Sequence, residues 1–179
     1  MAVTMPEPDQ AVLARRARIV ATLSAIVPGE GVIASERAMR PYESDGLTAY
    51  RSLPMVVVLP STTDQVARVL AYCYREGIKV VPRGAGTSLS GGALPLADGV
   101  LLGMAKFNRI REIDYDNRVV VAEPGVTNLA VTQVVEHAGY YYAPDPSSQI
   151  ACTIGGNVAE NSGGVHCLKY GMTTNNLCG

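Results

Sequence analysis

A short apolar run between two prolines constrains the fold of this chain more than any other feature. Residues 55–59 read Met-Val-Val-Val-Leu and lie between Pro54 and Pro60. The run is too short for a helix and is rich in β-branched residues, so it predicts a buried strand. A second apolar run, residues 78–81, ends at Pro82 and predicts another strand. The residues between the two runs decide how these strands are related.

Those residues predict a helix. Thr62 and Gln65 have the spacing of a capping box, and Gly77 is suited to the left-handed residue that follows a helix. Its apolar face is predicted to consist of Val66, Val69, Leu70 and Cys73. A helical crossover between two strands of one sheet makes them parallel and the connection right-handed. Residues 55–81 therefore predict a parallel β-α-β unit.

The remaining patterns predict both helices and strands. Apolar and arginine residues alternate over residues 9–27 as in an amphipathic helix. Further strands are predicted at residues 100–104, 110–115 and 118–122, the last two as a hairpin. Thr127 opens another helix, which ends at Gly139 and has Val131, Val134, Val135 and Ala138 on its apolar face. From residue 144 onward we expect a loop-built site with short helical turns, one of them opening at residues 155–159.

Composition excludes several classes of function. The 179 residues are 47% hydrophobic, enough for one buried core, and 15 Lys and Arg against 16 Asp and Glu give a net charge of −1. Binding to nucleic acid through bulk charge is therefore not expected. No apolar run approaches the ~18 residues that span a membrane. The four cysteines form no CxxC pair or zinc-type spacing, so we expect reduced thiols, no metal site and a cytosolic compartment.

Eighteen glycines are an excess, and many of them lie in two clusters. The first glycine loop, residues 82–92, directly follows the strand predicted at residues 78–81. Glycines let backbone N–H groups form a concave nest for anions, and hydroxyl groups add donors. The candidate ligand-binding residues here are Pro82, Arg83, Gly84, Ala85, Gly86, Thr87, Ser88, Gly91 and Gly92. An ordinary glycine-rich turn remains the alternative, and Arg83 can either pair with a phosphate or brace the loop.

Familiar phosphate loops do not fit this spacing. A dinucleotide fingerprint that starts at Gly84 needs glycine where Leu89 stands, and a Walker A motif from Gly86 needs lysine where Gly92 stands. The sequence therefore indicates neither a nicotinamide-type Rossmann protein nor a P-loop ATPase.

The second glycine cluster, residues 144–164, contains two Gly-Gly pairs, each near an asparagine. Backbone donors and amide side chains in such a cluster suit one extended polar ligand, and a tight crossing of loops is the alternative. The candidate residues are Pro144, Asp145, Pro146, Ser147, Ser148, Thr153, Ile154, Gly155, Gly156, Asn157, Asn161, Gly163 and Gly164. His166 has no second ligand pair for zinc and is interpreted as a hydrogen-bonded structural residue or a neighbour of a cofactor. Two such clusters in one chain favour a large ligand with an internal diphosphate.

The combined motifs resemble a family of flavoproteins. Arg-Gly-Ala-Gly-Thr-Ser at residues 83–88, Pro-Asp-Pro-Ser-Ser, Thr-Ile-Gly-Gly-Asn and Tyr170-Gly171 are similar to the FAD-binding domain of the vanillyl-alcohol-oxidase/p-cresol-methylhydroxylase (PCMH) flavoproteins. Within that family the sequence is most similar to the FAD-linked subunits of bacterial glycolate oxidases and to D-lactate and D-2-hydroxyglutarate dehydrogenases. The likeness covers residues 35–179.

The resemblance implies an α+β fold of two subdomains with FAD between them, the first containing the parallel β-α-β unit. It places the first glycine loop at the pyrophosphate and the second cluster, with Tyr170 and Gly171, along the flavin. Members with covalent FAD carry histidine directly after the second glycine of the Arg-Gly-Ala-Gly run, where this chain has Thr87, so noncovalent FAD is expected. A noncatalytic FAD-binding fragment and another flavoenzyme of the same fold remain alternatives.

The implied activity belongs to a longer protein. The resemblance implies oxidation of a 2-hydroxy acid such as glycolate or D-lactate to the 2-oxo acid, with a second FAD-type subunit and an iron–sulfur subunit as partners. It also implies a cytoplasmic location, with peripheral association at the inner membrane as an alternative. We expect an N-terminal helical segment over residues 1–49 and an FAD-binding domain over residues 50–179 that is incomplete at its C-terminal end. The resemblance implies a later substrate domain that we expect to be absent from these residues, so no catalytic residue is assigned.

Overall fold

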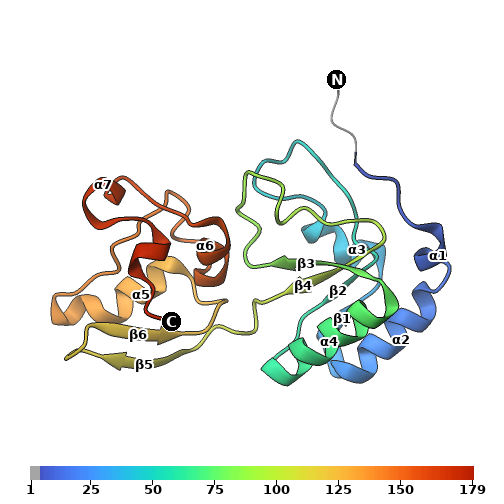
Figure 1. Ribbon diagram of the computed structural model, residues 1–179, viewed down its shortest axis with the longest axis horizontal. Helices are drawn as coiled ribbons and strands as arrows, with labels where there is room; N and C mark the ends of the chain where they lie inside the picture. Colours follow the sequence, from blue (N-terminus) through green and yellow to red (C-terminus); the bar gives the residue numbers. More distant parts are fainter. Residues whose placement is uncertain (1–4) are drawn as a thin grey trace. The chain divides into compact units, whose positions relative to one another are not determined.

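The structure is a computed structural model that describes residues 5–179 (Figure 1). The chain divides into two compact units, one ending at Lys106 and the other beginning at Phe107. Each unit has its own sheet: four strands in the first and two in the second. The fold is therefore of the predicted α+β class, with two subdomains.

The first unit is built on a mostly parallel sheet. Its strands are β1 (Val32–Ile33), β2 (Val56–Val58), β3 (Lys79–Arg83) and β4 (Gly99–Gly103), in the spatial order β1-β2-β4-β3. Both β2 and β3 pair with β4 in parallel, so the prediction of parallel strands is confirmed. β4 lies between β2 and β3, and the short antiparallel edge strand β1, which the sequence analysis did not predict, pairs with β2.

Helix α4 (Thr63–Glu76) connects β2 to β3 and begins and ends as predicted. The Thr62 side chain accepts a hydrogen bond from the N–H of Gln65, and Gly77 has a φ of +66°. The reciprocal half of the capping box is shifted by one residue, because Gln65 Oε1 accepts the N–H of Ser61 at 2.8 Å. One prediction for its apolar face is wrong: Leu70 is 44% exposed.

Val69, Tyr72 and Cys73 are the residues that α4 buries. They stand at i, i+3 and i+4 and so lie on one face of the helix, which packs on the sheet. Leu70 lies outside this face. Burial raises the pKa of the Cys73 thiol to about 11, which keeps it protonated at neutral pH.

The N-terminal region forms two helices rather than the single helix predicted over residues 9–27. These are α1 (Gln10–Leu13) and α2 (Arg16–Ile26), and Arg15 between them has non-helical backbone angles. The break accompanies contacts with the sheet and with α4. Arg15 Nη1 pairs with Glu76 at 2.8 Å, and Arg16 Nε donates to the carbonyl of Met55 at 3.0 Å.

The first unit buries one main apolar core. Ile19 and Leu23 of α2 pack there with the side chains of β2, α4 and β4. The core residues are Val12, Ile19, Leu23, Val27, Met55, Val56, Val58, Val69, Tyr72, Cys73, Ile78, Val100 and Leu102. A short helix, α3 (Glu36–Met39), contributes Met39 to a second cluster with Val57 and Leu101. The two clusters contain different strand residues because alternate side chains lie on opposite faces of the sheet.

The second unit begins with the predicted hairpin, β5 (Ile110–Asp114) and β6 (Val119–Ala122). Three α-helices follow: α5 (Asn128–Val135), α6 (Ile154–Glu160) and α7 (Cys167–Tyr170). The predicted helix after Thr127 is confirmed, as are the short helical turns beyond residue 144. Single 3-10 turns occur in the two units at Gly29–Gly31, Arg40–Tyr42, Glu136–Ala138 and Thr173–Asn176.

A buried carboxylate stabilises the base of this hairpin. Glu123 accepts hydrogen bonds from the Arg109 backbone at 3.0 Å, from the Arg109 guanidinium at 3.0 Å and from the Arg111 guanidinium at 2.8 Å. These donors lower the pKa of Glu123 to about 2, the Arg109 side chain contributing most.

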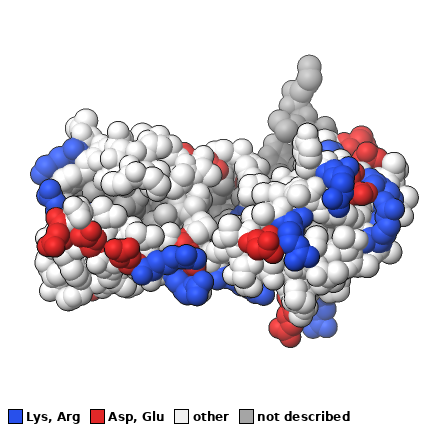
Figure 2. Space-filling model, turned by 60° about the horizontal axis from the view of Figure 1, so that its bottom comes forward, with Lys and Arg blue, Asp and Glu red and all other residues white. Residues whose placement is uncertain are grey.

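Charged side chains of both signs are interspersed on the face drawn in Figure 2. Among the described residues, none of the helices has the length and apolar character needed to cross a membrane.

Truncating Leu23 tests the contribution of α2 to the core of the first unit. Leu23 is fully buried, so Leu23→Ala should lower the free energy of unfolding by about 2–5 kcal/mol through lost burial and a residual cavity. Leu70→Ala, at a half-exposed helical position, is the matched control and should cost less than about 1 kcal/mol. Urea unfolding monitored by circular dichroism measures both, and equal losses would contradict the assigned core.

Glu123 should make stability depend on pH in the acidic range. Its pKa in the folded protein, about 2, lies below the ordinary value of 4.5, so its contribution is fully present above pH 4.5. That contribution is lost as the pH falls from about 4.5 toward 2. Comparing urea midpoints of the wild type and Glu123→Gln between pH 7 and pH 3 should show a flatter dependence for the variant. Parallel curves would contradict this role.

Candidate functional site

The guanidinium of Arg83 braces the first glycine loop from inside the first unit. Arg83 is the last residue of β3 and is buried. Its Nη1 lies 2.8 Å from the Ser44 carbonyl oxygen, 3.2 Å from that of Ala93 and 3.4 Å from that of Tyr42. Burial lowers the pKa of Arg83, an effect that Asp45 opposes. These contacts brace the loop, and the pairing of Arg83 with a phosphate stays a prediction.

Gly86 lies directly beside the Arg83 guanidinium, where there is no room for a side chain. Its φ is +76°, and a Cβ at this position would lie 2.3 Å from Nη2 of Arg83. A side chain here would be strained by the backbone and would also displace the arginine. Gly86 therefore serves the close approach of a side chain within the chain itself.

Residues 45 and 46 hold the far part of the same loop. The Asp45 carboxylate accepts the N–H of Gly91 at 3.1 Å, and the N–H of Gly46 donates to the Ser88 carbonyl at 3.0 Å. A Cβ on Gly46 would lie 2.7 Å from the Thr87 carbonyl oxygen, so only glycine fits there. The sequence analysis missed Asp45 and Gly46, because they lie far from the loop in the sequence.

The middle of the first glycine loop keeps its backbone donors available. Within the described residues of the first unit, the N–H groups of Ala85, Gly86 and Thr87 have no hydrogen-bond acceptor. All three residues are exposed or half-buried. Three successive donors held in place by a buried arginine have the chemistry of an anion-binding nest.

The second glycine cluster lies entirely in the second unit, and its Thr153–Asn157 part begins α6. The N–H groups of Ile154 and Gly155 donate to the carbonyls of Val126 and Pro124, both at 2.8 Å. A Cβ on Gly155 would lie 2.6 Å from Cβ of Pro124. Gly155 thus permits α6 to pack closely against residue 124, as the crossing-of-loops alternative predicts. A Cβ on Gly156 would contact only Thr153 Oγ1, at 3.3 Å.

Three buried polar atoms near this helix lack partners among the described residues. They are Oδ1 of Asn128, Oγ1 of Thr153 and Nδ2 of Asn157. Thr153 and Asn157 are predicted site residues, whereas Asn128 was not predicted. Asn128 also donates to the Pro144 carbonyl at 3.0 Å. Unsatisfied buried groups are costly and are typical of sites prepared for a ligand or water.

The loop at residues 144–148 is joined to the end of the second glycine cluster. Asp145 Oδ2 lies 2.6 Å from His166 Nδ1, and this hydrogen bond is the largest influence lowering the pKa of Asp145. A Cβ on Gly164 would lie 2.1 Å from Asp145 Oδ1. The backbone carbonyl of Pro146 accepts a hydrogen bond from the N–H of Gln149, and that of Ser148 accepts one from the N–H of Cys152. The structure therefore brings together Asp145, Gly164 and His166.

The last predicted site residues lie around α7. Gly171 ends α7 with a φ of +81°, and Tyr170 packs edge-on against Tyr141 with ring centroids 6.0 Å apart. Lys169 Nζ lies 4.9 Å from the centroid of the Tyr170 ring. Asn161 has left-handed backbone angles, and its Oδ1 accepts the N–H of Thr174 at 3.1 Å.

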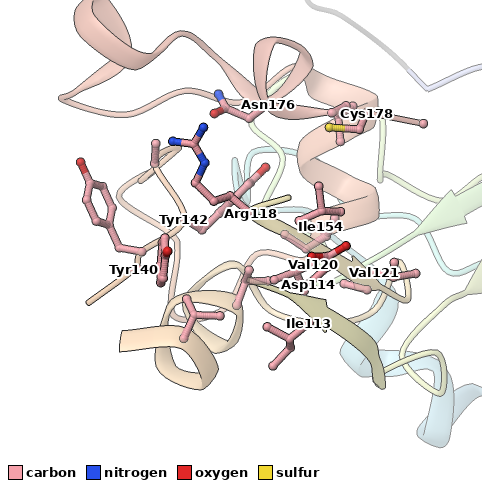
Figure 3. Close-up of a pocket in the computed structure, with 18 of the residues that line it drawn as sticks. Ile113, Asp114, Arg118, Val120, Val121, Tyr140, Tyr142, Ile154, Asn176 and Cys178 are labelled. Carbon is pink, nitrogen blue, oxygen red and sulfur yellow. The ribbon is translucent and has the colours of Figure 1, made fainter. Parts of the chain in front are cut away.

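An apolar cavity of about 660 Å³ also lies in the second unit, and it is distinct from most of these residues. Figure 3 shows Val120 and Val121 of β6, Ile154 of α6 and Tyr142 on its walls. Of the predicted site residues, only Ile154 and Gly155 line it. Its lining is mostly apolar, and Asp114, Arg118 and Asn176 are the charged or amide side chains in it.

No group of three or more potential metal ligands occurs among the described residues. Cys73 and Cys152 are buried, Cys167 and Cys178 are exposed, and all four are free thiols.

Comparison with known proteins places this geometry in a family. The family described as "FAD binding domain" matches residues 54–179, more than two thirds of the chain. The chain belongs to this FAD-binding family. The predicted resemblance and the predicted cofactor, FAD, are thereby confirmed.

Relatives within the FAD-binding family span much longer chains. The chain is 56% identical to glycolate oxidase subunit GlcD of Escherichia coli strain K12 over 90% of its own length and 32% of that protein. It is 37% identical to a D-lactate dehydrogenase of Anaerostipes hadrus, over 79% of this chain and 30% of that protein. It thus spans about a third of the length of these relatives.

A solved structure confirms the fold. p-Cresol methylhydroxylase superposes with a TM-score of 0.73 and 21% identity, covering 90% of this chain and 32% of that one. The predicted PCMH-type architecture is therefore confirmed.

The residues present fit FAD in two respects. The three open N–H groups at residues 85–87 suit phosphate oxygens, and they are exposed enough to be reached. The unpartnered atoms of Thr153 and Asn157 suit a polar ligand or an ordered water near α6. In that role the donors would be backbone N–H groups, and the side chain of Arg83 holds the loop that carries them.

Replacing Gly86 tests the link between the loop and Arg83. Gly86→Ala should lower the free energy of unfolding by about 2 kcal/mol more than Gly29→Ala, because only the former displaces a hydrogen-bonded charge. Gly29 is the matched control: its φ is +74°, and a Cβ there would meet nothing within 4 Å. Urea unfolding measures both variants, and equal losses would contradict the bracing role.

Proposed function

We propose that this chain is the FAD-binding part of a flavoprotein oxidoreductase that oxidises a 2-hydroxy acid, glycolate or D-lactate, to the 2-oxo acid. The main support for the FAD-binding role is that the backbone N–H groups of residues 85–87 have no hydrogen-bond acceptor within the described residues of the first unit. The similarity to a glycolate oxidase subunit and to a D-lactate dehydrogenase supports the substrate class. The whole activity belongs to a full-length protein of which this chain is a part.

The chemistry divides between the cofactor and the polypeptide. Oxidation of a 2-hydroxy acid removes a hydride equivalent from the α-carbon and a proton from the hydroxyl group, and FAD supplies the two-electron acceptor. The residues of this chain bind and orient the cofactor. Groups that hold the substrate carboxylate and accept the proton are proposed to lie in a separate substrate domain, so no catalytic residue is assigned among residues 1–179.

The domain boundaries are also a proposal. We place a helical segment at residues 1–49 and the FAD-binding domain at residues 50–179, and we propose that the domain is incomplete within this chain. The apolar cavity of about 660 Å³ beside the two-stranded sheet supports incompleteness. Isolated two-stranded sheets are marginally stable, and an open apolar wall suits additional polypeptide.

The proposed full-length enzyme passes electrons to an iron–sulfur subunit and contains a second FAD-type subunit. The word "subunit" in the name of the Escherichia coli relative supports a multi-subunit enzyme. We place it in the cytoplasm, with peripheral association at the inner membrane as the second possibility.

Turnover by the full-length protein tests the substrate class. With an artificial electron acceptor, we expect glycolate or D-lactate to be oxidised faster than D-2-hydroxyglutarate. Preferential use of D-2-hydroxyglutarate would move the protein to another branch of the family. Absence of activity on all three, with FAD bound, would favour a noncatalytic FAD-binding protein.

Release of the cofactor tests its mode of attachment. A threonine at position 87 cannot form the bond that histidine makes to flavin, so acid precipitation of the yellow protein should leave all the flavin in the supernatant. Absorbance at 450 nm of supernatant and pellet measures this. Flavin retained in the washed pellet would show covalent attachment and overturn the proposal.

A further inference from the structure

Two parts of the second glycine cluster meet through one aspartate. Within the described residues, the hydrogen bonds between residues 144–148 and residues 161–171 both end on the Asp145 carboxylate. Oδ2 contacts Nδ1 of His166 at 2.6 Å, and Oδ1 accepts the N–H of the same residue at 3.4 Å. One carboxylate therefore holds both the ring and the backbone of His166.

The crossing at this point leaves no room for a side chain on the second segment. A Cβ on Gly164 would lie 2.1 Å from Oδ1 and 2.2 Å from the carbonyl oxygen of Asp145. The absence of a side chain at residue 164 lets the segment approach closely enough for His166 to reach the carboxylate. Gly164 and His166 thus act together on the same partner.

Each segment is anchored separately on its other side. The Pro144 carbonyl accepts Nδ2 of buried Asn128 at 3.0 Å. The Ser162 carbonyl accepts both the N–H and the hydroxyl of buried Thr173, at 2.9 and 2.7 Å. These anchors fix the two segments to the body of the second unit, and the Asp145–His166 contact sets their spacing from each other.

We propose that His166 is a positioning residue for the cofactor site, forming with Asp145 a latch that holds residues 144–148 against residues 163–167. The proposal rests on the proposed function, because both segments are predicted to contact FAD. The latch has a defined proton arrangement. An ionised carboxylate only accepts, so Nδ1 of His166 carries hydrogen and Nε2 points away from Asp145 as the remaining ring nitrogen.

The surroundings explain why the latch depends on this pair. The His166 side chain is 62% exposed, whereas that of Asp145 is 21% exposed. Tyr170 lies beside the imidazole, with ring centroids 6.5 Å apart, and Lys169 Nζ lies over the Tyr170 ring. Neither residue donates a hydrogen bond to Asp145. Removing the imidazole therefore leaves the carboxylate without its side-chain partner.

A double-mutant cycle tests the latch. His166→Gln and Asp145→Asn, made in the full-length protein, should each weaken FAD binding about three- to tenfold, and the double variant should be no weaker than either single variant. His166→Arg, which supplies another donor to Asp145, should recover most of the affinity. His137→Gln removes the other histidine of the chain and is the matched control, expected to leave affinity unchanged. Flavin fluorescence titration measures each dissociation constant.

A readout without flavin separates the latch from the proposed function. Nitrogen-15 NMR of the two histidines of this chain, assigned with His137→Gln, should show His166 protonated at Nδ1 in the wild type and predominantly at Nε2 in Asp145→Ala, which removes the acceptor, at pH 8. Failure of the full-length protein to bind FAD, with this tautomer shift present, would overturn the proposed function and leave the latch. Nε2 protonation in the wild type, or additive effects in the cycle, would overturn the latch even if FAD binds.

Discussion

The shape of the first glycine loop depends on one buried cation. Arg83 brings a guanidinium under the loop, and burying a charge without partners would be prohibitively costly. The carbonyls of Tyr42, Ser44 and Ala93 supply those partners. Because these residues come from both sides of the loop, satisfying one charge also fixes the path of residues 42–46 and 83–93. The backbone N–H groups of residues 85–87 lie within this fixed path, and in the proposed binding role their pre-formed arrangement lowers the ordering cost of binding.

Local patterns were enough to predict most elements of the fold. The apolar run at residues 55–59, the helix that ends at Gly77 and the hairpin at residues 110–122 each rest on short-range chemistry, and each is confirmed. The insertion of β4 between β2 and β3, and the pairing of β1, are decided by contacts distant in the sequence. The break at Arg15 likewise accompanies an ion pair with Glu76, 61 residues away. Periodicity carries no information about such partners.

The site shows a different limit of sequence reasoning. Glycines at residues 86, 155 and 164 were predicted to admit a ligand, yet each also admits an atom of the chain itself: a guanidinium, a proline ring and a carboxylate. A glycine that admits a ligand and a glycine that admits another part of the chain look alike in the sequence, because glycine indicates only that another atom approaches the backbone. The group that approaches the glycine shows which role the glycine has, and only the structure identifies that group. Asp45, Gly46 and Asn128 were missed because they lie in no recognisable sequence motif.

Two aspartates limit where an anion can bind. Asp45 takes the N–H of Gly91 in the first unit, and Asp145 takes the N–H of His166 in the second. Each carboxylate therefore accepts a hydrogen bond from an N–H group at the end of a glycine-rich segment. A negative charge at that position repels a phosphate. In the first loop Asp45 also offsets the charge of Arg83, so in the proposed role the attraction for a diphosphate would come mainly from the N–H groups of residues 85–87. Such an arrangement selects a ligand by the position of its oxygens rather than by net charge, which agrees with a chain whose formal charge is only −1.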